Sequence, residues 1–189
     1  MEVSMSIQIE HKLNKENIDS TIKTYKNSLS KMDRNIPSDN IIDFLLKLKR
    51  DKMSKGPYVG VSLFEAANRI MTDLVILYGI KDLLNGEYED IDFPEYTVEY
   101  GHGNHNNYDI VSEHNGKKLI GEAFNVSPSL FKSKKNASLK KLRNNKGKKL
   151  IKILIYNNDA VNEKYKPKTN NNEYHIRVNI DNWIRHNCI

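Results

Sequence analysis

The sequence predicts an α/β fold in which helices flank a mixed β-sheet. Three observations support this class: a long, broadly apolar helix pattern over residues 62–86, strand patterns over residues 96–126, and a continuous apolar strand pattern over residues 149–158. With 189 residues, the chain is long enough for one domain with a substantial core. We expect residues 1–55 to form an N-terminal helical arm and residues 56–189 to form the main domain.

The N-terminal third is predicted to be helical. Apolar residues recur at steps of three and four from Ile18 to Met32, the spacing of one helix face. A second helix is expected after "RNIPSD", with Ser38 or Asp39 as its cap. The turn-rich stretch "KGPYVG" then marks the expected boundary of the main domain.

The strongest helix pattern is "SLFEAANRIMTDLVILYGIKDLLNG". Ser62 and Glu65 have the spacing of a capping box, in which each residue satisfies an orphan backbone amide at the helix start. Asn85-Gly86 is a typical helix end. Because apolar side chains cover so wide a face, we expect this helix to be buried against a sheet.

Strand patterns follow this helix. "YDIVSEH" and "KKLIGEAFNV" are joined by Asn115-Gly116, the strongest short signal for a two-residue hairpin turn. Ser127-Pro128 is predicted to begin a helix that continues to about Arg143. The other predicted strands are "YTVEYG", "KLIKILIYNN" and "YHIRVNIDNW".

Net charge, cysteine content and the length of the apolar runs limit which classes of protein fit the sequence. The net charge of +6 favours a polyanionic partner, although only modestly. The single cysteine, Cys188, excludes an intrachain disulfide and fits a reducing compartment. No signal peptide is expected, and the apolar run "LVILYGI" is far shorter than the ~20 residues of a membrane span. We therefore expect a soluble, cytoplasmic protein without a membrane partner.

Two carboxylates stand out in the predicted hairpin. The turn at Asn115-Gly116 sets Asp109 and Glu122 roughly opposite each other. Such a pair would repel without a cation, and hard oxygen ligands on a rigid strand edge suit Mg²⁺. Other interpretations remain open: Asp109 as an ordinary turn residue, Glu122 paired with a lysine or arginine, and Glu65 as a helix cap alone.

The order helix–strand–strand–strand–helix–strand, with Asp109 and "Gly121-Glu122-Ala123-Phe124", resembles the PD-(D/E)XK nucleases, which share the restriction-endonuclease-like fold. The resemblance covers roughly residues 61–180. It implies a type II restriction-like endonuclease that cuts double-stranded DNA as a homodimer. It also implies that Asp109 and Glu122 bind Mg²⁺ and that Glu65 assists them.

The sequence departs from the family pattern at two positions. Tyr108 replaces the motif proline, and Phe124 replaces the motif lysine that assists the attacking water. We predict that Lys134 or Lys135 supplies the missing cation, with Lys132 as the next choice. Two alternatives stay open: an inactive relative that binds nucleic acid without cutting it, and an interaction domain with no nucleic-acid partner.

A segment with many basic residues and no acidic ones follows the predicted strand that carries Glu122. No acidic residue occurs between Ala123 and Asn158, whereas a solvated face usually mixes signs. We expect this segment to contact the phosphate backbone, although a merely soluble helix and loop would also fit. The residues predicted to contact DNA are Lys132, Lys134, Lys135, Lys140, Lys141 and Arg143. A zinc site at His102, His105 and Asp109 is disfavoured by the surrounding glycines and asparagines.

Overall fold

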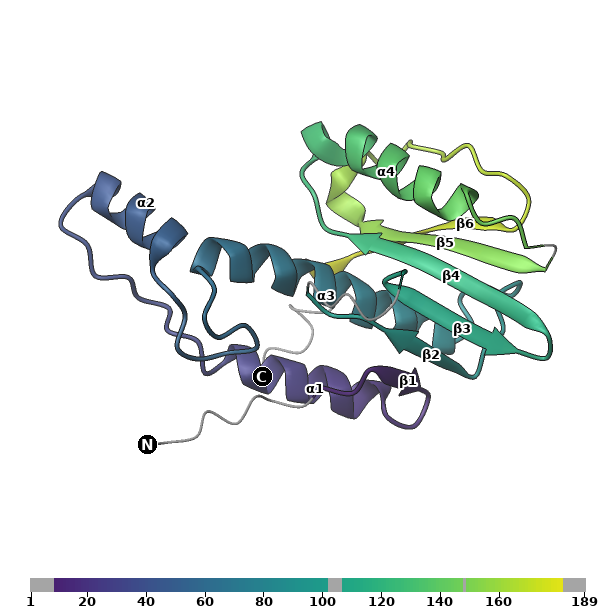
Figure 1. Cartoon of the computed structure of the whole chain (residues 1–189), viewed down its shortest axis with the longest axis horizontal. Coiled ribbons are helices and arrows are strands. Elements are labelled where there is room, and N and C mark those ends of the chain that lie inside the picture. The colour runs from purple at the N-terminus through teal and green to yellow at the C-terminus, as the bar shows by residue number, and fades with distance from the viewer. Residues whose placement is uncertain (1–8, 102–106, 148, 182–189) are drawn as a thin grey trace.

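The computed structural model describes residues 9–101, 107–147 and 149–181 (Figure 1). His102, His105 and Cys188 lie outside the described residues. Within them, the elements are β1 (Lys12–Asn14), α1 (Ile18–Leu29), α2 (Ile41–Arg50), α3 (Leu63–Leu84), β2 (Glu95–Val98), β3 (Ile110–His114), β4 (Lys117–Phe124), α4 (Pro128–Arg143), β5 (Leu150–Asn157), the short 3₁₀ helix η1 (Asn158–Ala160) and β6 (Glu173–Val178). None of the described helices is both long enough and apolar enough to cross a membrane.

The strands form one six-stranded mixed sheet in the order β1-β2-β3-β4-β5-β6. Neighbours from β1 to β4 are antiparallel, and β4, β5 and β6 are parallel. This confirms the α/β class and the order helix–strand–strand–strand–helix–strand from α3 to β5. Strand β1 was not predicted, because three residues are too few to show a period of two.

The predicted hairpin joins β3 to β4. His114 pairs with Lys117 across the turn, and both turn residues have positive φ, 50° at Asn115 and 69° at Gly116. This is the combination that a type I′ turn requires, and asparagine followed by glycine adopts it at low cost. The turn therefore fixes the register, which runs from His114↔Lys117 to Ile110↔Gly121.

Helices cover both faces of the sheet. Helix α3 packs on one face, where Leu74, Val75, Ile76 and Leu77 are all buried, as the broad apolar pattern predicted. Helix α1 lies on the same side and contributes Ile18, Ile22 and Tyr25 to the same core. Helix α4 covers part of the opposite face over a smaller, partly aromatic core. Helix α2 has no buried residue and projects from the rest of the protein (Figure 1).

Candidate carboxylate site

The two predicted carboxylates meet at one end of the β3–β4 hairpin. One register step beyond the pair Ile110↔Gly121, Asp109 faces Glu122. The Oδ2 atom of Asp109 accepts a hydrogen bond from the backbone N–H of Ala123 at 2.8 Å, which ties the head of one strand to the end of the other. Glu122 is only 7% exposed. The hairpin register thus places the two carboxylates side by side in a largely dry environment.

A third acidic residue, which is buried, directly follows β2. The backbone N–H of Glu99 donates to the carbonyl of Asp109 at 2.9 Å, so Glu99, Asp109 and Glu122 stand in a row across three strands. Sequence reasoning missed Glu99, although an acid at the end of the alternating pattern "YTVEYG" was a visible signal. In the described part of the chain, however, no three His, Cys, Asp or Glu side chains are close enough to hold one metal ion. The two acids that face each other directly are therefore Asp109 and Glu122.

These carboxylates line a pocket of about 530 Å³ between the sheet, α3 and α4. Helix α3 contributes polar side chains from its first three turns, and α4 contributes two lysines. The polar and charged residues around the pocket are Glu65, Asn68, Arg69, Thr72, Glu99, Asp109, Glu122, Asn125, Lys134 and Lys141. A pocket with both carboxylates and ammonium groups can bind a cation and a phosphate together.

Lysine side chains reach the carboxylates from α4. The Nζ atom of Lys141 lies 2.6 Å from Oε1 of Glu122 and 5.3 Å from the centre of the Tyr108 ring. Lys134 precedes Lys141 by two helical turns and lines the same pocket. Lys135 instead points away, with its Nζ 5.8 Å from the ring centres of Phe131 and Tyr165. The structure therefore places Lys134 at the site but Lys135 outside it, and adds Lys141.

The pKa values of Asp109 and Glu122 are shifted by burial and by nearby charges. Burial is the main cause that raises the pKa of Asp109, and the hydrogen bond from Ala123 and the charges of Lys141 and Lys134 oppose it. Burial also raises the pKa of Glu122, and the neighbouring Asp109 raises it further. Lys141 and Lys134 partly offset both effects. Two buried, mutually repelling carboxylates form a site that favours added positive charge.

Glu65 lies at the rim of the pocket in two roles. Its backbone N–H donates to Oγ of Ser62 at 3.2 Å, which confirms Ser62 as the helix cap. Its side chain does not complete the reciprocal half of the predicted capping box. Its carboxylate pairs with Arg69 at 2.5 Å, so it is not directed to Asp109 or Glu122. Arg69 also lies over the Tyr58 ring, 5.4 Å from its centre. Glu65 thus acts on the site by orienting Arg69.

A buried polar network supports this end of the sheet. Asp73 of α3 is fully buried and accepts hydrogen bonds from Tyr25 at 2.6 Å, from Tyr58, and from the backbone N–H of Gly101 at 3.0 Å. Burial raises the pKa of Asp73 to about 6, against the effect of these donors. Because Gly101 follows Glu99 by two residues, the network fixes the chain beside the carboxylate row.

Phe124 is a core residue. It is 2% exposed and packs among aromatic rings, with centres 6.1 Å from Phe131 and 5.9 Å from Tyr156. Its side chain shares the α4 face with Glu122, as period-two alternation predicts. The position of the motif lysine is thus filled by an aromatic core that α4 covers.

The other predicted DNA-contacting residues divide into two groups. Lys132 and Lys140 are exposed on α4. Arg143 instead makes two hydrogen bonds to Glu173 of β6, at 2.7 and 2.8 Å, and so holds α4 against the sheet. The free cationic surface of α4 therefore consists of Lys132, Lys134 and Lys140, with Lys141 at its inner edge.

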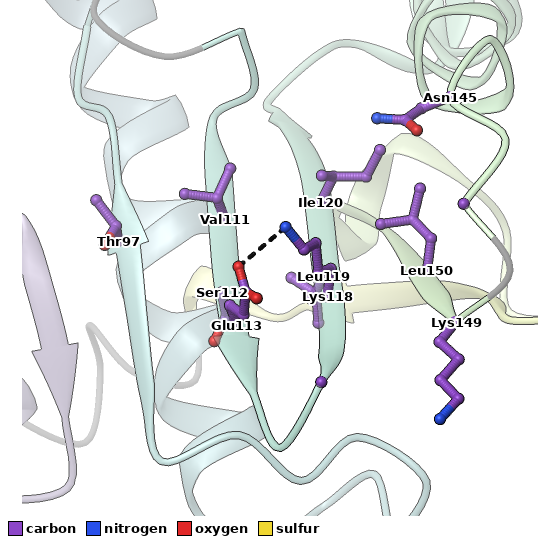
Figure 2. A pocket seen from close by; sticks show the side chains of 12 residues that line it. Thr97, Val111, Ser112, Glu113, Lys118, Leu119, Ile120, Asn145, Lys149 and Leu150 are labelled. Atoms are coloured by element: carbon purple, nitrogen blue, oxygen red, sulfur yellow. Dashed lines mark ion pairs between the residues drawn. The ribbon is translucent and has the colours of Figure 1, made fainter.

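A second hollow, of about 570 Å³, continues along the same face of the sheet (Figure 2). Val111 and Ile120 line it, two residues from Asp109 and Glu122 respectively, and alternation sets all four on one face. Asn145 and Lys149, from the α4–β5 connection, stand on its far side (Figure 2). Lys118 pairs with Glu113 at 3.1 Å on its floor (Figure 2). The hollow therefore lies on the α4 side of the hairpin, between the turn and the carboxylate pocket.

Comparison with known proteins adds no functional information. No family model, no curated protein and no solved structure matches the chain. What the site does must therefore be inferred from its own groups: a carboxylate pair and two lysines that line one pocket.

Proposed function

We propose that this protein is a magnesium-dependent endonuclease of the restriction-endonuclease-like type that hydrolyses phosphodiester bonds of double-stranded DNA. One observation carries the proposal: Asp109 and Glu122 face each other across β3 and β4 at the floor of a pocket that Lys134 and Lys141 enter from α4. Carboxylates for a cation and ammonium groups for a phosphate are the two requirements of metal-assisted phosphodiester hydrolysis.

The donor set fits Mg²⁺. This ion takes one or two protein carboxylates and fills the rest of its coordination shell with water and substrate phosphate. Burial raises the pKa of both Asp109 and Glu122, so a bound cation would stabilise their charged forms. Bound Mg²⁺ would acidify a water and stabilise charge on the phosphate.

The remaining groups act on the substrate. Lys141 lies against Glu122, which stands two residues before the position where the resembling family has its motif lysine. In this proposal Lys141 orients the attacking water and stabilises the negative charge that develops on the phosphate. Lys134 holds the phosphate from one side of the pocket, and Arg69, oriented by Glu65, holds it from the other. The exposed lysines of α4 contact the DNA backbone next to the cut.

A second candidate function is DNA binding without cleavage, and one specific observation favours it. Phe124 is locked in an aromatic core, and Lys141 neutralises Glu122 in the ion pair. A pair satisfied in this way could serve stability alone. In either case α4 contacts DNA, so we expect Lys132→Gln and Lys140→Gln each to lower the slope of log affinity against log salt by about 0.9. An unchanged slope would remove α4 from the interface.

Cleavage of long duplex DNA with and without Mg²⁺ separates the two functions. The endonuclease proposal expects Mg²⁺-dependent fragments from the wild type, and at least a 100-fold slower rate from Asp109→Asn or Glu122→Gln, as is roughly typical when charge stabilisation is lost. Glu113→Gln is the matched control, because Glu113 is an exposed acid of the same hairpin that pairs only with Lys118. Binding without cleavage by the wild type would select the second candidate.

A further inference from the structure

Helix α2 presents an apolar stripe to solvent. Ile41, Ile42, Leu45 and Leu46 are 41–68% exposed, although they occupy one side of the helix at steps of one, three and four residues. The adjoining side, with Phe44 and Leu48, is partly buried. The stripe therefore exists in addition to the side of α2 that faces the protein.

The exposed apolar surface continues from α2 to the start of α3. Phe64 is 49% exposed, and the Nζ atom of Lys49 lies 5.3 Å from its ring centre. At roughly 200 Å² for each fully exposed large side chain, the stripe and Phe64 together present about 500 Å² of surface. A patch of this size is near the upper end of what a soluble monomer exposes and often marks a binding surface, so it fits an interface.

The charges around the stripe indicate what covers it. Asp39 lies just before the helix, and Lys49 and Arg50 lie at its end. An acidic beginning and a basic end are complementary to the same helix in the opposite direction. Antiparallel pairing of two copies would bring Asp39 of each close to Lys49 and Arg50 of the other and would also oppose the helix dipoles favourably.

We propose that α2 is the homodimer interface of this protein, with two copies of the stripe packed antiparallel about a two-fold axis. A two-fold interface needs a self-complementary patch, and this stripe meets that condition in both shape and charge. The two apolar patches would cover roughly 1,000 Å², and their polar rims would bring the total into the range of about 1,200–2,000 Å² that stable interfaces have.

The geometry also relates the interface to the carboxylate site. Phe64 of the patch precedes Glu65, which lines the pocket. Dimerisation through this patch would thus bring the start of α3, where Glu65 lies, close to the shared interface. The inference does not rest on the proposed function, because the stripe is exposed whatever the pocket does.

Sedimentation equilibrium of the full chain at micromolar concentration tests whether this surface forms a dimer interface. We expect the wild type to be dimeric and Leu45→Glu to be monomeric but folded, because Leu45 contributes nothing to the core. Leu130→Glu is the matched control, since Leu130 is similarly exposed but lies on α4. The proposal would be overturned if the wild type were monomeric, or if Leu45→Glu stayed dimeric. It would also be overturned if the protein were a monomer that binds lipid vesicles through α2.

Charge reversal tests the antiparallel arrangement. Asp39→Lys and Lys49→Glu should each raise the dimer dissociation constant about tenfold, because each places like charges opposite one another twice per dimer. An equimolar mixture of the two variants should recover wild-type affinity, since both contacts then join opposite charges. Circular dichroism establishes that each variant is folded. If the mixture stays as weak as the single variants, the antiparallel pairing is wrong.

Discussion

Neutralising one member of the carboxylate pair should make the metal-free protein more stable, and Asp109→Asn is the sharpest way to do this. The asparagine Oδ1 can still accept the hydrogen bond that Asp109 takes from the backbone N–H of Ala123 at 2.8 Å. The ion pair between Lys141 and Glu122 also remains. The substitution therefore removes a charge and leaves the local contacts in place.

The size of the effect follows from the register. Residues directly opposite each other in an antiparallel pair have Cβ atoms about 5 Å apart. Two unit charges at about 5 Å repel by about 3 kcal/mol with an effective dielectric constant of about 20. Lys141 and Lys134 offset part of this repulsion. We therefore expect Asp109→Asn to stabilise the metal-free protein by about 1–2 kcal/mol at pH 8, or about 2–8 °C in Tm for a chain of this size.

Whether Asp109→Asn stabilises the protein depends on pH and on bound metal. Folding raises the pKa of both Asp109 and Glu122, so their cost to stability appears only as pH rises through those values. The advantage of Asp109→Asn should therefore shrink as pH falls through those raised values, because both acids then become protonated in the wild type. Mg²⁺ at ten times its Kd should stabilise the wild type by about 1.4 kcal/mol and leave the variant unchanged.

Thermal unfolding measures all of these effects at one fixed protein concentration. The scans compare wild type, Asp109→Asn and the control Glu113→Gln at pH 4 and pH 8, with and without Mg²⁺. The reasoning would be refuted if Asp109→Asn were destabilised by several kcal/mol at pH 8. It would also be refuted if Mg²⁺ stabilised the variant as much as the wild type.

Two further predictions concern the groups around the pair. Lys141→Met should slow Mg²⁺-dependent cleavage about 100-fold or more. Lys135→Met should cut at nearly the wild-type rate, because Lys135 lies against Phe131 and Tyr165. Equal cleavage rates for the two variants would exclude a catalytic role for Lys141. Folding raises the pKa of Asp73 to about 6, so the wild type should lose up to about 3 kcal/mol of stability, relative to Asp73→Asn, between pH 4 and pH 7. Parallel urea-denaturation curves across that range would contradict the role of Asp73.

Local chemistry made much of the fold predictable. The Asn115-Gly116 turn fixes the hairpin register, and the breadth of the apolar pattern around Leu74 predicts a helix buried against the sheet. Ser127-Pro128 likewise predicts the start of α4. Each of these signals acts within a few residues, and therefore survives in the sequence without knowledge of the tertiary structure. Helix α2 begins after Asn40 rather than Ser38 or Asp39, because the Asn40 side chain accepts the N–H groups of Ile42 and Asp43.

Only the part of the site that the hairpin brings together could be predicted from the sequence. Asp109 and Glu122 share a hairpin, so counting from the turn brings them together. The choice among the lysines of α4 depends instead on how that helix rotates on the sheet, which buries Ser138 and Leu139 and directs Lys141 inward. Glu99 joins the row only through the pairing of β2 with β3, which a loop separates in the sequence. The acid in "YTVEYG" is visible in the sequence, but neither the strand beside it nor the rotation of α4 is.

The central claim is that Asp109 and Glu122 form a metal site, and not merely a pair neutralised by Lys141. A crystal grown with Mn²⁺, which substitutes for Mg²⁺ at oxygen ligands and scatters anomalously, tests this most directly. We predict an anomalous peak within coordination distance of both carboxylates, with the Lys141 ammonium moved from its position 2.6 Å from Glu122. An empty site with the Lys141–Glu122 ion pair intact at saturating Mn²⁺ would contradict the account.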